Sequence, residues 1–131
     1  MNIQTIIAVV SGGALGALGR LWVLETTNRY LPDATFPLGT LYVNLIGSFF
    51  VGILFAYFNH TNLSPYIKLF IATGFFGAFT TFSTFAIEST MLLEASKYLY
   101  ALGNILLNVV GSIVLAAISY FLTTKLLQSF A

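Results

Sequence analysis

Polar side chains recur at helical spacing inside two strongly apolar stretches of the chain. Asn44 and Ser48 lie four residues apart, and the same interval separates Asn104, Asn108 and Ser112. Residues four apart share one face of a helix. In apolar surroundings such side chains must meet each other, water or a solute. The spacing therefore predicts either hydrogen bonds between packed helices or a polar row along a path for a solute.

A third stretch, from Thr73 to Phe85, combines two glycines, several threonines and a dense set of phenylalanines. Its intrinsic helix propensity is low. A break in this stretch would free backbone carbonyl and amide groups, which protein, water or an ion must then satisfy. An intact helix whose hydroxyls bond back to preceding carbonyls is the alternative, and the sequence pattern favours neither.

Two aromatic residues of this stretch could take part in anion chemistry. Phe82 and Phe85 are three apart and share a helix face, with the hydroxyls of Ser83 and Thr84 between them. The edge of an aromatic ring carries partial positive charge, so it can meet an anion without the strong attraction of a lysine. Neutral donors such as the Asn44 amide could replace part of the anion's water. Ordinary packing of the rings in a core is the other interpretation.

The charged residues within the apolar stretches offer no catalytic arrangement. Arg20 could extend to the lipid headgroups or raise the potential of an aqueous vestibule. Glu88 could line an entrance or pair with a lysine of a neighbour. The hydroxyls and the single His60 form no set of nucleophile, base and orienting group, and the chain has no cysteine. We therefore do not expect an enzyme.

The composition indicates what kind of element must position these side chains. Of 131 residues, 58% are hydrophobic and 7% charged, and the mean hydropathy is +0.93. A net charge of +1 excludes binding to nucleic acid through phosphate contacts. Because each helical crossing of a bilayer takes roughly 20 residues, the chain has room for four crossings and little else.

We predict an all-α integral membrane protein with four transmembrane helices. The expected spans are residues 3–24, 38–58, 66–93 and 98–122. Their connections are short, so residues 1–131 are expected to form a single four-helix membrane domain. The first span lacks the basic leader of a signal peptide and is expected to be retained. Its glycine-rich part, residues 12–19, is interpreted mainly as a surface for close helix packing.

Lysine and arginine near the span ends give no preferred orientation. Lys68 and Lys125 lie on the side of the termini, and Arg29 and Lys97 lie on the other side. A chain without this bias can insert in both directions, and two opposed copies can then form a dimer about an axis in the membrane plane. Orientation by other cues is the equally weighted alternative.

In combination, these motifs resemble one family, the small fluoride channels called Fluc or CrcB. The resemblance covers nearly the whole chain. It includes the glycine-rich segment that ends at Arg20, the second-span motif 39–48 around Asn44, and the motif 80–85 followed by Glu88. The third of these motifs is the most specific.

The resemblance implies an antiparallel, dual-topology homodimer with two fluoride pores, which exports fluoride passively from a microbial cytoplasm across the inner or plasma membrane. It implies that Asn44 is a pore-lining donor and that Phe82 and Phe85 flank the fluoride path. Ser83 and Thr84 would form a hydroxyl track beside the rings. The bilayer, fluoride and a second copy of the chain are the expected partners.

The resemblance also implies a third helix that is broken in mid-membrane and a structural Na⁺ ion at the dimer axis. The expected ligands are the backbone carbonyls of Gly77 and Thr80, with the helix interrupted at Gly77. Two positions depart from the family pattern. Ala78 stands where a second glycine is frequent, and Asn108 stands where a smaller hydroxyl residue is expected.

A small four-helix proton-coupled efflux transporter is the alternative function. Such a transporter needs a titratable group near the membrane centre, midway along its first helix. The first acidic residue of this chain is Glu25, at the end of that span. A non-conducting assembly subunit is a third possibility, but it would not need the hydroxyl and aromatic residues of the third span.

Overall fold

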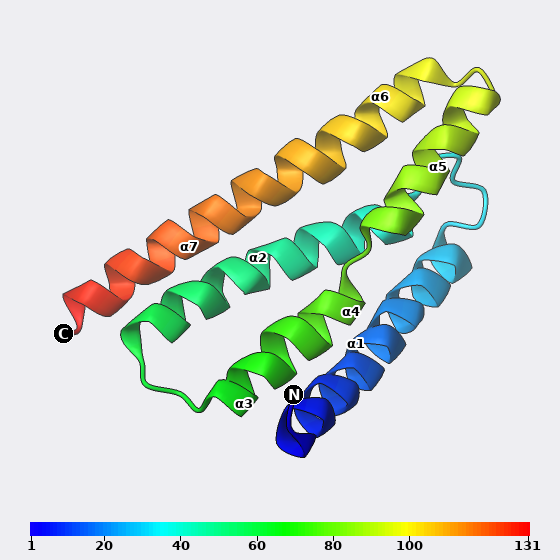
Figure 1. The fold of residues 1–131 in the computed structure, drawn as a ribbon. Helices are drawn as coiled ribbons and strands as arrows, with labels where there is room; N and C mark the ends of the chain where they lie inside the picture. The colour runs from blue at the N-terminus through cyan, green and yellow to red at the C-terminus, as the bar shows by residue number, and fades with distance from the viewer.

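All 131 residues are described by a computed structural model in which every regular element is helical (Figure 1). Four helical rods are each long and apolar enough to cross a membrane. The expected all-α, four-span class is confirmed. The elements in chain order are α1 (Ile3–Tyr30), α2 (Leu38–His60), α3 (Pro65–Lys68), η1 (Leu69–Phe76), α4 (Gly77–Phe79), α5 (Phe82–Glu94), α6 (Tyr98–Leu106), η2 (Leu107–Gly111) and α7 (Ser112–Ser129), where η marks π-helical turns.

The first and fourth rods extend beyond their predicted ends at residues 24 and 122. Helix α1 continues to Tyr30, because the Thr27 hydroxyl donates to the Val23 carbonyl at 2.8 Å and the Leu31 N–H donates to the Thr27 carbonyl. A helix of 28 residues is about 42 Å long, whereas the hydrocarbon core is about 30 Å thick. The polar last turns, which the sequence placed in connections, can therefore remain helical outside the hydrocarbon.

Both termini lie at the same end of the molecule, next to the connection between α2 and α3 (Figure 1). Ser64 begins α3 by accepting a hydrogen bond from the Tyr66 N–H, and Pro65 occupies the first turn. The turn between α5 and α6, at the opposite end, contains Ser96 in the left-handed conformation with φ of 59°. The four rods therefore run alternately up and down.

Glycines set the closest helix contacts. A Cβ added at Gly12 or Gly16 of α1 would overlap the carbonyl oxygen of Phe70 or Phe75 in η1, so the two backbones touch. The predicted packing role of the glycine-rich segment is confirmed. A Cβ at Gly52 of α2 would likewise overlap the Ser119 hydroxyl of α7. These contacts leave α2 in the middle, between the α1–η1 pair and the fourth rod.

The most enclosed side chains include polar ones, whereas the outer surface is apolar. Asn104 and Thr40 are fully buried, as is Val43. Large apolar side chains are exposed on all four rods, as a lipid environment requires. The fold thus places polar groups inside the helix bundle, where the candidate site lies.

Candidate functional site

The third rod is interrupted between α4 and α5. Thr80 and Thr81 have extended backbones, with ψ angles of 158° and 112°. The Thr81 N–H donates to Asn44 Oδ1 at 2.8 Å, and Asn44 Nδ2 donates to the Thr81 carbonyl at 3.1 Å. The side-chain amide of α2 thus takes over hydrogen bonds that a continuous helix would make. The predicted break of the third helix is confirmed.

The break lies at Thr80–Thr81, and the expected interruption at Gly77 is wrong. Gly77 begins α4 with helical angles, φ of −60° and ψ of −34°. Two hydrogen bonds decide the location of the break. Asn44 Oδ1 accepts from the Thr81 N–H, and the Thr81 hydroxyl accepts from the Thr84 N–H at 3.2 Å and so caps α5. A Cβ at Gly77 would meet only the Ala72 carbonyl, at an ordinary 3.7 Å.

The interruption diverts the usual partners of two backbone carbonyls. In a continuous helix the Gly77 carbonyl would accept from the Thr81 N–H, and the Thr80 carbonyl from the Thr84 N–H. These two N–H groups donate instead to Asn44 Oδ1 and Thr81 Oγ1. Carbonyl oxygens released in this way suit a hard cation such as Na⁺. The same two carbonyls are those that the sequence resemblance indicates, so the residues present fit such an ion.

A cavity of about 410 Å³ lies beside the break and is named here the central cavity. Its polar residues come from both spaced rows of the sequence and from the break itself. No charged residue lines it. The lining consists of Asn44, Ser48, Val51, Thr80, Thr81, Phe82, Phe85, Asn108, Val109, Ser112, Ile113 and Ala116.

The two polar rows meet directly. Asn44 Nδ2 donates to Asn108 Oδ1 at 2.8 Å, between α2 and η2. The amides of the rows therefore join two helices, which confirms the first interpretation, and Ser48 and Ser112 line the same cavity. Asn108, which departs from the expected hydroxyl, brings an amide into the cavity wall.

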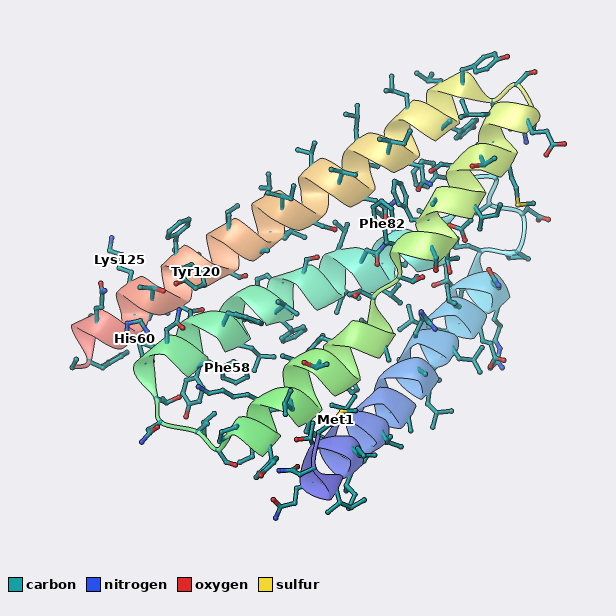
Figure 2. The ribbon with its side chains drawn as sticks, viewed as in Figure 1. Met1, Phe58, His60, Phe82, Tyr120 and Lys125 are labelled. Carbon is teal, nitrogen blue, oxygen red and sulfur yellow. The ribbon has the colours of Figure 1, made fainter.

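The two aromatic rings of the motif form a pair at the start of α5. The rings of Phe82 and Phe85 have centroids 5.2 Å apart and planes at 69°, an edge-to-face arrangement. Phe85 is 6% exposed, whereas Phe82 is 76% exposed. Figure 2 shows Phe82 at the beginning of α5, beside the connection from α4. The Phe85 ring therefore forms a buried part of the cavity wall, and the Phe82 ring lines the same cavity but is exposed.

A second cavity, of about 280 Å³, is named the loop cavity and lies between residues 31–37, the start of α2, and α5. Thr84, Thr40 and Glu88 are among its lining residues. The Thr40 hydroxyl donates to Glu88 Oε1 at 2.8 Å, while Glu88 Oε2 is buried without a hydrogen-bond partner. Glu88 thus faces a polar cavity and bonds to a hydroxyl of its own chain.

One hydrogen bond links the linings of the two cavities. Thr81 lines the central cavity, Thr84 lines the loop cavity, and Thr81 Oγ1 donates to Thr84 Oγ1 at 2.9 Å. Ser83 Oγ lies 3.5 Å from Thr81 Oγ1 but lines neither cavity, and Arg20, partly exposed on α1, also lines neither. The structure therefore places most of the predicted site residues at one of the two cavities, but not Ser83, Arg20 or Gly77.

Sequence reasoning missed Thr40 as a site residue. It lies four residues before Asn44, so the row of three formed by Thr40, Asn44 and Ser48 could have been read from the spacing. Ser89 was also missed. Its hydroxyl accepts from Asn104 Nδ2 at 2.9 Å, and a single serine in an apolar helix carries no sequence signal for that contact.

The fold and the site together define a class. The chain is a multi-pass membrane protein with two partly open cavities next to a broken helix, and a hydroxyl–hydroxyl bond links one lining residue of each cavity. Amides, hydroxyls and ring edges without a fixed charge can replace water around a small anion while holding it only weakly.

The family model described as CrcB-like protein, Camphor Resistance (CrcB), matches residues 7–120. Among similar proteins is a fluoride-specific ion channel FluC of Campylobacter jejuni, 46% identical over 107 residues, which cover 82% of this chain and 87% of the relative. Another, from Sulfurimonas denitrificans, is 46% identical over 123 residues, covering 93% and 95% of the two chains. A third, from Escherichia coli, is 43% identical over 121 residues, covering 92% and 94%. The chain belongs to the CrcB-like family, which confirms the resemblance noted from its motifs.

Proposed function

We propose that this chain forms a fluoride-selective channel that exports fluoride passively from the cytoplasm across the cell membrane and so reduces fluoride toxicity. The observation that carries the proposal is its family membership with relatives named as fluoride-specific ion channels. The central cavity beside the Phe82–Phe85 pair, which is lined by amides and hydroxyls among apolar groups and by no charged residue, supports it independently.

The lining of the central cavity explains how an anion could pass without being trapped. A lysine in a dry cavity would hold a small anion tightly, whereas hydroxyl, amide and ring-edge groups each contribute a weak attraction. Fluoride would move between the central cavity and the loop cavity, where Glu88 faces the vestibule and Arg20 of α1 would add positive potential. The hydroxyls of Thr84, Thr81 and Ser83 would accompany it across the junction.

Asn44 has two roles in this proposal. Its amide stabilises the break by accepting from the Thr81 N–H and donating to the Thr81 carbonyl, and it also lines the central cavity. Both of its N–H groups have protein acceptors, Thr81 O and Asn108 Oδ1. As a donor to fluoride it would exchange one of these acceptors for the ion, which limits the strength of binding.

We further propose that two copies assemble in opposite orientations as a homodimer. The balanced placement of Lys68 and Lys125 against Arg29 and Lys97 supports insertion in both directions. The exposed Phe82 ring supports a pore that needs a second copy, because a ring bordering the cavity is left uncovered by its own chain. Each pore would then contain surfaces of both subunits.

A structural Na⁺ ion at the dimer axis completes the proposal. The carbonyls of Gly77 and Thr80 would hold it, since their ordinary hydrogen-bond partners are diverted. The bound cation would supply positive charge near the pores and satisfy carbonyls that a dry interior would otherwise leave unpaired.

The proposed function is tested with purified protein in liposomes loaded with potassium fluoride. We expect fluoride efflux only after addition of a potassium ionophore, because passive movement of an anion builds a potential that the ionophore must dissipate. Protein-free liposomes are the control. Efflux driven by a proton gradient without ionophore would instead indicate the coupled transporter, and absence of efflux in both conditions would reject transport of fluoride.

A further inference from the structure

A chain of buried hydrogen bonds leads away from the break, beyond the cavity-lining Asn44 and Asn108, to Asn104 and Ser89, which line neither cavity. Asn44 donates to Asn108 Oδ1 at 2.8 Å. Asn108 Nδ2 donates to both the carbonyl and the side-chain oxygen of Asn104, at 2.9 and 2.8 Å. Asn104 Nδ2 then donates to Ser89 Oγ at 2.9 Å, and Ser89 donates to the Phe85 carbonyl at 2.9 Å.

This chain begins and ends on the same short segment of the third rod. At one end, Asn44 holds the Thr81 peptide directly before α5. At the other end, the Ser89 hydroxyl reaches the Phe85 carbonyl, one turn into α5. The hydrogen bonds therefore form a closed circuit through three rods, and the enclosed segment is the turn that carries Phe82 and Phe85.

The side chains of the circuit are buried, so the loss of any one of its hydrogen bonds is costly. Asn104 is 0% exposed, and Asn108 and Ser89 are also buried. A buried amide that loses its partner has no water with which to replace it, so removing one link leaves the next group unpaired. The circuit is thus able to fix the position of a segment whose own backbone is interrupted.

We propose that Asn104, Asn108 and Ser89 are positioning residues of the conduction path, which hold the first turn of α5 and thereby the orientation of the Phe82–Phe85 pair. The inference rests on the proposed function, because it assigns these residues to the same anion path. Ser89 and Asn104 touch no ion in this proposal, since neither lines the central cavity. Ser89 and Asn104 would affect conduction only by holding the Phe82 and Phe85 rings in position.

Two variants of nearly equal shape test the circuit at Ser89. Ser89→Thr keeps the hydroxyl and adds a methyl group, whereas Ser89→Val replaces that hydroxyl by a second methyl. We expect Ser89→Val to reduce fluoride efflux per folded channel about tenfold relative to Ser89→Thr, the scale of one lost buried hydrogen-bond partner. We also expect its fluoride-to-chloride preference to fall, because displaced rings no longer present their edges to the path.

Thr90→Val is the matched control. Thr90 follows Ser89 on α5 and makes the same type of bond, from its hydroxyl to the Ala86 carbonyl at 3.0 Å, but its side chain is exposed and outside the circuit. Its efflux and anion preference should equal those of the parent. The amount of folded protein and the thermal midpoint are measured for each variant, so that the efflux is expressed per folded channel.

The outcomes separate this inference from the proposed function. If the parent channel shows no fluoride efflux, the proposed function fails, and the inference fails with it. If the parent conducts and Ser89→Val loses stability but keeps parental efflux and preference per folded channel, the circuit is purely structural and the inference is overturned. Should neither Ser89 variant fold, Ser89→Ala, which only removes the oxygen, is compared with Thr90→Val under the same criteria.

Discussion

Asn44→Leu removes the side chain that holds the interruption of the third rod. Leucine has a similar volume but cannot exchange hydrogen bonds with the Thr81 peptide. Three bonds are lost: from the Thr81 N–H at 2.8 Å, to the Thr81 carbonyl at 3.1 Å and to Asn108 Oδ1 at 2.8 Å. The backbone N–H and carbonyl of the buried residue Thr81 are left without these partners.

The expected loss in the free energy of unfolding depends on which groups lose their hydrogen-bond partners. Side-chain hydrogen bonds in membrane proteins average about 0.6 kcal/mol, because the side chains find other partners when the bundle loosens. A peptide group fixed at a helix break cannot rearrange in this way, and each stranded buried group costs about 1–3 kcal/mol. For the two groups of the Thr81 peptide we therefore expect a loss of about 2–6 kcal/mol in the free energy of unfolding.

Unfolding of the purified protein by sodium dodecyl sulfate in mixed micelles, followed by helical circular dichroism, measures this difference. Asn59→Leu is the matched control, because Asn59 lies on the same helix and donates one exposed hydrogen bond, to the Tyr120 hydroxyl at 3.0 Å. Its loss should be below about 1 kcal/mol. Equal unfolding free energies for the two variants would refute the assignment of Asn44 as the group that holds the break.

Four further predictions follow from particular contacts. Gly16→Ala should destabilise the protein by about 1–3 kcal/mol, because its Cβ overlaps the Phe75 carbonyl, whereas Gly13→Ala, whose Cβ finds its nearest contact at 3.9 Å, should not; thermal midpoints compare the two. Phe82→Ile and Phe85→Ile should each reduce fluoride efflux severely in liposomes. Only Phe85→Ile should also lower the thermal midpoint, because Phe85 is buried and Phe82 is exposed. Parental efflux in both variants would show that the rings do not take part in conduction. A cysteine introduced at Asn62 of this cysteine-free chain should react with an impermeant reagent from both sides of the membrane, and labelling from one side only would reject dual topology. Gly77→Ala should leave the subunit folded, because a Cβ there has room, and thermal midpoints measure this. Dimer stability should fall when Na⁺ is replaced by a large organic cation, and equal stability in both would reject the proposed ion.

Local sequence patterns were sufficient to predict the four crossings and the two polar rows, whereas they left a broken and an intact third helix equally open, and the break was predicted from the family resemblance. Hydropathy sets the crossings, and a spacing of four residues sets the shared faces of Asn44 with Ser48 and of Asn108 with Ser112. The low helix propensity of residues 73–85 indicated a weak point in the third span. Each of these inferences depends only on residues close together along the chain.

The location of the break could not be predicted in the same way. The family resemblance indicated an interruption at Gly77, yet the helix continues through this residue. The deciding partner is Asn44, which lies 37 residues away in sequence. Likewise, the contact of Asn104 with Ser89 depends on how two rods pack, and neither residue type reveals it. Non-local hydrogen bonds therefore set the details that a pattern of propensities leaves open.

The π-helical turn η2 fixes a rotational offset within the fourth rod. A π turn accommodates one residue more than an α turn, and one residue corresponds to about 100° of rotation about the helix axis. Ahead of η2, Asn104 faces Ser89 of α5, and beyond it Ser119 lies against Gly52 of α2. Deleting one residue within 107–111 would relax the turn to an ordinary helix and leave the faces of the flanking residues nearly unchanged, because the π turn absorbs the extra residue. Ser119 would still face Gly52, whereas the same deletion in the α-helical part between Ser112 and Ser119 would turn Ser119 away by about 100°. The π turn is therefore the one part of the rod where a residue can be lost without separating these two contacts.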